Sequence, residues 1–189
     1  MLGWIIFGVV AVLVVAIIAW FIKTYNKLVK QRNRVKNSWS QIDVQLKRRF
    51  DLIPNLVETT KGYAKHESGI LEEFARARNV YSQASSKGDI AGMSEANNML
   101  SATLSRLIAV SEAYPELKAD SHFTEMMSEL RETEDKIAYA RQFYNDVVLT
   151  YNNMREVFPG SIVANMFSFK EAEFFKADEA SKENVKVQF

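Results

Sequence analysis

The chain has 189 residues, of which 48% are hydrophobic, 24 are basic and 23 are acidic. This length and composition suit a single folded domain; the near-neutral total charge argues against nucleic-acid binding, and the lack of cysteine excludes disulfides, thiolate metal sites and cysteine nucleophiles. Because prolines and glycines are few and no alternating strand pattern is evident, the sequence predicts an all-α fold.

The first expected element is a membrane anchor formed by residues 1–22. The stretch from Leu2 to Ile22 carries no charge, and its 21 residues would span about 31 Å of helix against a hydrocarbon thickness of about 30 Å. Trp4 and Trp20 lie near its ends, where aromatic rings settle at the headgroup layers. A cleaved signal peptide would need a positively charged start and a small-residue cleavage site, which this segment lacks. We therefore predict an uncleaved single span.

The residues after the anchor are strongly basic and predict its orientation. Positions 23–49 hold nine basic residues and one acidic residue, Asp43, whereas positions 50–189 hold 15 basic and 22 acidic residues. Segments rich in Lys and Arg resist translocation across the membrane. We therefore expect the N-terminus outside the cell and the remainder of the chain in the cytoplasm.

Residues 23–66 are expected to form an amphipathic stem helix that belongs to an antiparallel bundle. At 100° per residue, one face collects apolar side chains, namely Leu28, Val35, Trp39, Ile42, Leu46 and Ile53. The opposite face collects basic side chains, namely Lys23, Lys27, Lys30 and Arg34. We expect the basic face to meet anionic lipid headgroups, although a solvated face that acts only as the topology signal explains the same pattern.

The apolar face of the stem needs a partner close to the membrane. The later helices begin only after Tyr63, so they are expected to cover the stem above Trp39 and to miss the part nearest the bilayer. Leu28, Val35 and Trp39 are therefore the candidates for contact with a second copy of the chain or with lipid. This predicts a homo-oligomer.

Pro54 interrupts the stem in the middle of an apolar run. A proline inside a helix removes one hydrogen bond and clashes with the preceding turn, at a cost of about 3 kcal/mol. We expect it to bend or divide the helix near Ile53 and interpret it as a residue that shapes the helix.

Three further helices and a short one are expected within residues 67–166. Apolar residues recur at helical spacing from Ile70 to Ala84, from Ile90 to Ile108 and from Phe123 to Phe158. Gly88 is expected to end the first of these helices, Asp89 to cap the second, and Pro115 to follow the end of the second. The short apolar piece "IVANMF" comes next.

Residues 167–189 are expected to form a mixed C-terminal tail. Four phenylalanines in it require burial, namely Phe167, Phe169, Phe174 and Phe175.

The sequence contains no pattern of residues typical of an active or metal site. His66 resembles the start of a zinc-protease motif, but Ile70 stands where the second histidine is required. We interpret His122 as a surface or capping residue, since a zinc site needs three or four ligands. There is no phosphate-binding glycine loop, no Gly-x-Ser-x-Gly and no Glu-x-x-His. We therefore predict a protein that is not an enzyme and that holds no metal or cofactor.

Charged residues flank the apolar faces of two of the expected helices. Asp43 and Arg49 do so on the stem, and Glu134 and Arg141 on the longest helix. Such residues could pair across helices and set their register. We interpret them instead as boundary residues whose aliphatic stems lie along the apolar surface.

The chain resembles the LemA family of bacterial single-pass membrane proteins. The resemblance rests on the stretches "WSQIDVQLKRRFDLIPNLVETTKGYAKHE", "YPELKADSHF" and "TEDKIAYARQFYNDVVLTYNNMREVFPGSIVA". It implies a short outside N-terminus, one helix in the bacterial inner membrane and a cytoplasmic antiparallel helical domain. Asp135 and Lys136 stand where the family usually has Asn and Arg. The family brings no established enzymatic activity, and some members are tied to the formation of specialised bacterial membranes.

These observations together predict a membrane-anchored, non-catalytic scaffold or adaptor on the cytoplasmic face, self-assembling and involved in membrane organisation. Its expected partners are membrane lipid, further copies of itself and a membrane protein, with no nucleic acid. Two other functions stay open: an accessory subunit of a membrane protease or transporter, and a surface-exposed receptor module with the same domain outside the cell.

Overall fold

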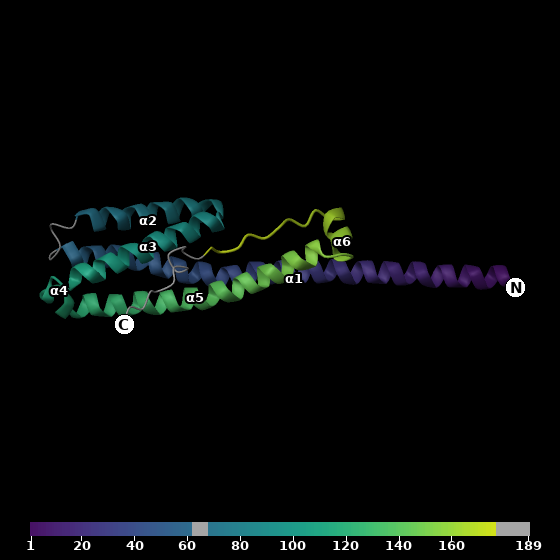
Figure 1. The fold of residues 1–189 in the computed structure, drawn as a ribbon, viewed down its shortest axis with the longest axis horizontal. Coiled ribbons are helices and arrows are strands. Elements are labelled where there is room, and N and C mark those ends of the chain that lie inside the picture. The colour runs from purple at the N-terminus through teal and green to yellow at the C-terminus, as the bar shows by residue number, and fades with distance from the viewer. Residues whose placement is uncertain (62–67, 177–189) are drawn as a thin grey trace, which may run out of the picture. The chain divides into compact units, whose positions relative to one another are not determined.

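Helices account for nearly all of the chain that can be described. A computed structural model describes residues 1–61 and 68–176, and these residues form six α-helices and no strand (Figure 1). The helices are α1 (Leu2–Lys61), α2 (Ser68–Lys87), α3 (Ile90–Ser111), α4 (Pro115–Ala119), α5 (Ser121–Glu156) and α6 (Gly160–Met166). The predicted all-α fold is confirmed, with α1 as the long apolar N-terminal helix.

The chain divides into two compact units. The anchor unit comprises Met1–Trp39 and Tyr144–Ala172, and the bundle unit comprises Ser40–Phe143 and Glu173–Phe189. The helices α1 and α5 each contribute one stretch to both units.

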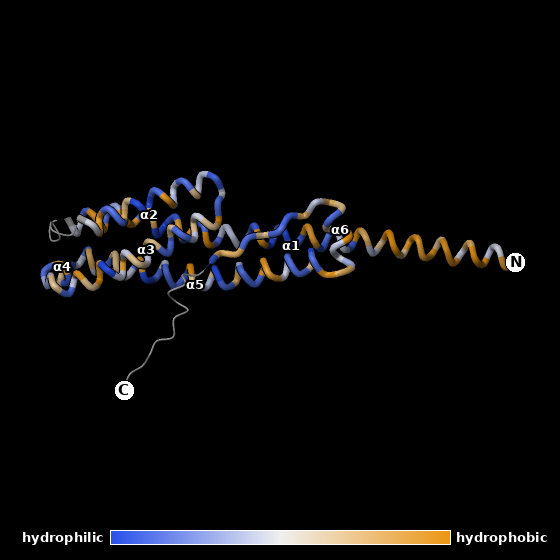
Figure 2. Tube along the Cα trace, turned by 45° about the horizontal axis from the view of Figure 1, so that its top comes forward, coloured by the Kyte–Doolittle hydropathy of each residue, from blue (hydrophilic) through white to orange (hydrophobic). Residues whose placement is uncertain are grey.

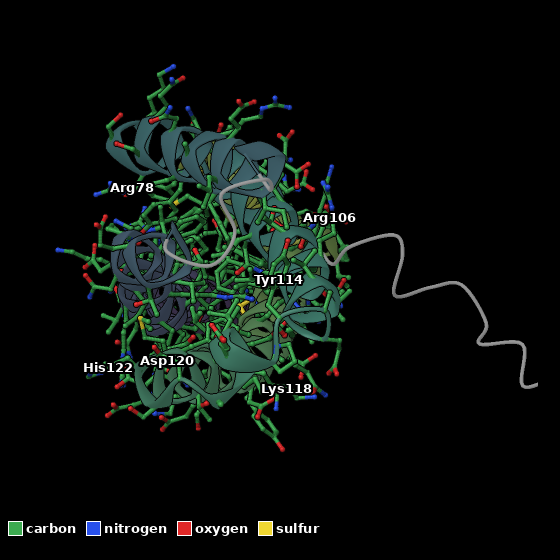
Figure 3. All side chains as sticks on the ribbon, turned by 90° about the vertical axis from the view of Figure 1, so that its left-hand side faces the viewer. Arg78, Arg106, Tyr114, Lys118, Asp120 and His122 are labelled. Atoms are coloured by element: carbon green, nitrogen blue, oxygen red, sulfur yellow. The ribbon has the colours of Figure 1, made fainter. Side chains whose placement is uncertain are left out.

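The bundle unit is built from amphipathic helices that turn one apolar stripe inward. Buried side chains on its part of α1 recur every three or four residues, namely Ile42, Leu46, Phe50, Ile53 and Leu56. The ring of Phe50 stacks on Tyr81 of α2, with centroids 4.2 Å apart. Charged side chains such as Arg78 and Lys118 point outward at the periphery (Figure 3). The helix stripes therefore meet in one core.

The expected turn and capping residues are found where the sequence placed them. Gly88 adopts a left-handed backbone, with φ of 66°, and ends α2. The side chain of Asp89 caps α3 by accepting a backbone N–H of that helix. Pro115 follows the end of α3 as expected, and it also opens the short helix α4, which was not predicted. The Asp120 carboxylate, also not predicted as a cap, accepts two backbone N–H groups at the start of α5, at 2.8 and 3.0 Å. Local chemistry therefore explains these helix ends.

Pro54 lies exposed inside α1, and the helix continues beyond it to Lys61. Of the two expected outcomes, a bend or a division, the division does not occur. Because its side chain faces solvent, the ring displaces no core residue. The bend near Pro54 stays a prediction.

The core of the anchor unit forms where α6 and the segment after it pack on α1. Leu28 has no exposed surface and belongs to a cluster with Tyr151, Val163, Ala164 and Phe169. The extended segment that follows α6 turns back alongside α1 (Figure 1). We call residues 167–172 the strap. Together with α6, the strap covers the stem at a point close to the end of the uncharged run.

This arrangement corrects an expectation about the stem. Leu28 is buried within its own chain and is therefore unavailable to a second copy. The expectation failed because residues 160–172 fold back along α1 after α5 has ended. Val35 and Trp39 are half-buried, and the Trp39 ring lies edge-on to Tyr144 with centroids 5.6 Å apart. These two side chains retain some exposed surface.

Polar side chains of α5 hold the strap in place. The Tyr151 hydroxyl donates to the Lys170 carbonyl at 2.8 Å, and burial raises the pKa of this phenol, which keeps it protonated. The Asn152 amide donates to the Ala172 carbonyl at 2.9 Å and accepts the Ala172 N–H at 3.0 Å. The strap belongs to no helix or sheet, so these bonds replace the ladder that a regular element would supply.

The four phenylalanines of the tail divide equally between buried and exposed. Phe169 is buried beside Leu28, and Phe175 is buried within the bundle unit. Phe167 and Phe174 remain exposed, so the expectation that all four would be buried is wrong for these two.

Replacing Leu28 by alanine should destabilise the anchor unit. Removing a buried leucine costs the lost transfer free energy plus a cavity term, about 2–5 kcal/mol. Amide hydrogen exchange of the full-length chain in mild detergent should show this loss as faster exchange in residues 163–172. The control is Leu149→Ala on α5 of the same unit, where half of the side chain is already exposed. Equal effects of the two substitutions would contradict the assigned core.

Candidate functional site

The uncharged part of α1 has the exposure expected of a lipid-facing helix. Every side chain from Leu2 to Ile22 is exposed except Phe21, which is half-buried. Among the described residues, α1 alone is long and apolar enough to cross a membrane. An apolar helix whose side chains are left uncovered by protein requires another apolar environment. The finding supports single-pass anchoring through this segment.

The basic residues assigned to lipid headgroups lie at the start of the stem. Lys23, Lys27, Lys30 and Arg34 are all exposed on α1. Their neighbour Arg32 instead places its guanidinium over the Phe169 ring, 5.3 Å from the centroid. The four exposed cations are free to meet phosphate groups, and their contact with lipid stays a prediction.

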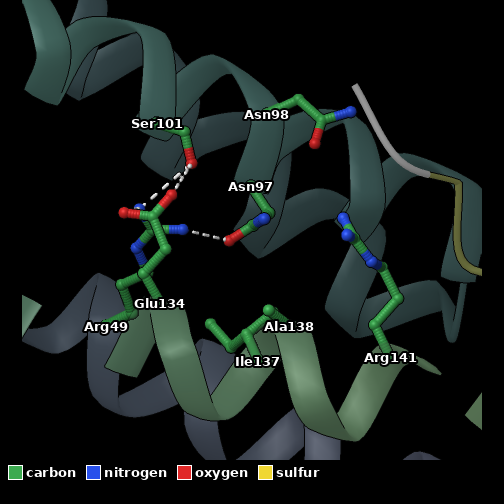
Figure 4. Close-up of a pocket in the computed structure, with 8 residues that line it drawn as sticks. All are labelled: Arg49, Asn97, Asn98, Ser101, Glu134, Ile137, Ala138 and Arg141. Atoms are coloured by element: carbon green, nitrogen blue, oxygen red, sulfur yellow. Dashed lines mark hydrogen bonds and ion pairs between the residues drawn. The ribbon is translucent and has the colours of Figure 1, made fainter. Parts of the chain in front are cut away.

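A polar cluster inside the bundle unit joins three helices. Arg49 of α1 is fully buried, and its Nη1 donates to the Asn97 Oδ1 of α3 at 2.6 Å (Figure 4). Its Nη2 donates to the Ser101 hydroxyl at 3.1 Å and pairs with the Glu134 carboxylate of α5 at 3.5 Å. The same hydroxyl donates to the other oxygen of Glu134 at 3.2 Å. One guanidinium therefore fixes α1, α3 and α5 against one another.

The charge of Arg49 is buried away from water. Burial lowers the pKa of Arg49, and the Glu134 carboxylate acts in the opposite direction. Arginine remains protonated in proteins, so the guanidinium needs its donors matched by acceptors. About half of the Glu134 side chain is exposed, so water screens this ion pair. We infer that these contacts help to set the register of the three helices.

Beside this cluster lies a cavity of about 270 Å³, which we call the Arg49 cavity. Residues of α1, α3 and α5 line it, namely Arg49, Asn97, Asn98, Ser101, Glu134, Ile137, Ala138 and Arg141 (Figure 4). The buried Nε of Arg49 has no hydrogen-bond partner among the described residues. The lining carries two guanidiniums and one carboxylate, so it suits water or a small anion better than a metal cation. Ser101 has no imidazole beside it to activate its hydroxyl.

The structure overturns part of the boundary interpretation. Arg49 and Glu134 pair across helices, and Arg141 lines the same cavity, whereas Asp43 lies in a different surface depression beside Tyr81. The burial of Arg49 could have been predicted from its spacing. It lies three residues after Leu46 and four before Ile53, which is the spacing of core positions on α1.

Asn97 and Ser101 were not predicted from the sequence. They lie one turn apart on α3 and face the same guanidinium, Asn97 being buried in the apolar stripe of that helix. Asn97 lies within the apolar repeat of α3, and this position was the sequence feature that could have indicated a buried polar contact.

No metal site emerges from the described part of the chain. Residues 1–61 and 68–176 contain no group of three or more His, Asp or Glu side chains that could hold an ion. His122 is exposed at the start of α5, in agreement with its interpretation as a surface residue. His66 lies outside the described residues.

Comparison with known proteins agrees with the resemblance to the LemA family. The pattern that defines the LemA family matches residues 38–189. Magnetosome protein MamQ 2 of Paramagnetospirillum magneticum is 30% identical over 186 residues, which cover 86% of this chain and 68% of the relative. Magnetosome protein MamQ of Magnetospirillum gryphiswaldense is 27% identical, covering 85% and 68%. Protein LemA of Metamycoplasma hominis is 24% identical, covering 85% and 72%.

Replacing the buried Arg49 by methionine should destabilise the bundle unit more than the same change at Arg48. The first substitution leaves the Asn97 amide buried without a partner, at a cost of about 1–3 kcal/mol. Arg48 is about half exposed and pairs with Glu129 at 3.6 Å, a surface contact worth about 0–1 kcal/mol. Urea unfolding of the full-length chain followed by circular dichroism measures both.

A double variant, Arg49→Met with Asn97→Leu, tests whether the unpaired Asn97 amide causes this destabilisation. It should recover most of the loss, because an apolar pair replaces both polar partners. Equal costs for the Arg48 and Arg49 substitutions, or no recovery in the double variant, would contradict the assigned network.

Proposed function

The chain belongs to the LemA family, and from this premise we propose that it is a membrane-anchored, non-catalytic helical scaffold on the cytoplasmic face of the bacterial inner membrane. The scaffold holds a helical domain at the membrane surface and contributes to membrane organisation. The names of its relatives as magnetosome proteins support the link to membrane organisation.

One observation carries this proposal: the folded core begins almost where the uncharged run ends. Ile22 is the last residue of that run, and Leu28 is already fully buried in the core of the anchor unit. Fewer than two helical turns separate them, and all of these residues lie within one helix. A flexible tether would let a domain diffuse away from the bilayer. A helix that continues directly from span to core holds this unit at the membrane surface, as a scaffold requires.

The non-catalytic part of the proposal rests on the chemistry of the Arg49 cavity. Its only hydroxyl, that of Ser101, lies between a guanidinium and a carboxylate, and its two guanidiniums are poor proton acceptors at neutral pH. The polar groups of the cavity are used to join helices.

The orientation follows from charge. The exposed lysines and arginines directly after the span form the flank that stays inside the cell. A reporter fused after Phe189 that is active only in the cytoplasm should therefore be active, and a reporter that requires export should be silent. The reverse pattern would contradict the cytoplasmic scaffold and favour the surface-exposed receptor.

We also propose that the scaffold self-assembles. Leu28 is excluded as a contact because it is buried, which leaves Val35 and Trp39, whose side chains keep part of their surface on α1. Apolar surface close to the bilayer favours lateral contact between copies.

The mass of the full-length chain in mild detergent tests self-assembly. We expect an oligomer for the parent and a smaller mass for Val35→Ser, with the exposed Val44→Ser as the matched control. A monomeric parent at micromolar concentration would contradict self-assembly and favour the accessory subunit of a larger membrane complex.

A further inference from the structure

The connection from α5 to α6 and the residues after it form a second uncharged stretch in the anchor unit. The segment "VFPGSIVANMFSF" runs from Val157 to Phe169 between Glu156 and Lys170. It contains α6, and a Cβ on Gly160 would approach the Met154 carbonyl oxygen to 2.5 Å, so the turn into α6 is tight. Such a stretch on a protein surface needs an explanation.

The two faces of this segment differ in what they contact. Val163 and Ala164 point into the core against Leu28. The outward side chains are large and apolar, with exposed fractions of 62% at Val157, 76% at Phe158, 47% at Ile162, 64% at Met166 and 48% at Phe167. We call these five residues the collar. They form an apolar surface that no described part of the chain covers.

The collar lies beside the end of the membrane span. The Phe167 ring is 5.9 Å from Phe21 and 4.6 Å from Tyr25, measured between centroids. Phe21 is next to last in the uncharged run of α1, and its ring contacts Trp20, 6.5 Å away. Figure 2 shows the continuously hydrophobic part of α1 ending beside α6. A span that fills the hydrocarbon layer therefore brings the collar to the headgroup boundary of the same leaflet.

We propose that the collar inserts into the membrane interface and forms a second lipid contact of the anchor unit. The occupant is the bilayer itself, because the collar continues the apolar surface of the span through the contacts of Phe167 with Phe21 and Tyr25. Amphipathic elements of this kind bury their apolar face about 5–10 Å into the headgroup region. The inference rests on the proposed membrane anchoring. It adds that the collar is the place at which the folded part of the chain contacts lipid.

The exposed cations of α1 fit the same arrangement. Lys23 and Lys27 follow the span directly and can reach phosphate groups while the collar contacts acyl chains. Arg155 and Glu156 close the N-terminal side of the uncharged segment and pair with each other at 2.7 Å. Charged groups thus bound the collar where water is expected to begin.

Insertion into one leaflet has a mechanical consequence. Side chains wedged between headgroups occupy area in that leaflet only, and such insertion is sensitive to curvature. The collar thereby supplies a physical route by which the scaffold affects membrane shape.

The lack of cysteine in the chain permits a direct test with single-cysteine variants. Phe158→Cys and Met166→Cys report on the collar, Leu149→Cys reports on exposed α5 of the same unit, and Val12→Cys reports on the span. Each full-length variant is labelled with an environment-sensitive fluorophore and reconstituted into phosphatidylcholine–phosphatidylglycerol vesicles. Quenching by iodide from the water is then measured for each site.

We expect quenching at the two collar sites to be several-fold weaker than at Leu149, with emission shifted to the blue, and quenching at Val12 to be weakest. Collar sites as accessible as Leu149, with Val12 protected, would overturn the collar proposal and leave the anchor intact. An accessible Val12 would instead overturn the anchoring on which the proposal rests.

Dilution separates lipid from a second copy of the chain as the occupant. At less than one chain per vesicle, protection by lipid should persist. Protection that disappears on dilution would show that another copy covers the collar and would also overturn the proposal.

Discussion

The burial of Leu28 beneath Tyr151, Val163, Ala164 and Phe169 is the interaction on which the rest of the anchor unit depends. One helix has to satisfy two environments, because its first part is exposed and apolar while its next part must be covered by protein. The change occurs within a few residues of Ile22. It is possible only because α6 and the strap return to this part of α1, so the folded unit forms next to the span.

The strap shows how an irregular segment can be held without secondary structure. Backbone groups outside helices and sheets need partners, and Tyr151 and Asn152 supply three hydrogen bonds to residues 170 and 172. This places Phe169 over Leu28 and leaves Phe167 outside, beside Phe21. Two phenylalanines separated by one residue thus serve the protein core and the proposed lipid contact.

The bundle unit contains a buried polar network around Arg49. Arg49 occupies a core position of α1, and it is matched by Asn97, Ser101 and Glu134 on two other helices. A buried guanidinium needs its acceptors at fixed positions, so this network favours one register of the three helices. Specific helix pairing is compatible with the proposed scaffold, whose role would be to keep surfaces in fixed places.

The sequence by itself determined the helices other than the short α4, and the uncharged span, because these depend on neighbours along the chain. They follow from apolar spacing, from Gly88 and Asp89 at a turn, from Pro115 after a helix end, and from the absence of charge before Lys23. Which partner covers each side chain was decided by the tertiary structure. The burial of Leu28, the pairing of Arg49 with Glu134 and the different exposure of Phe167 and Phe169 depend on where residues 97–101, 134 and 160–172 return in space. Periodicity identifies the face of a helix that must be covered, but contacts between residues far apart in the chain arise only when the whole domain packs.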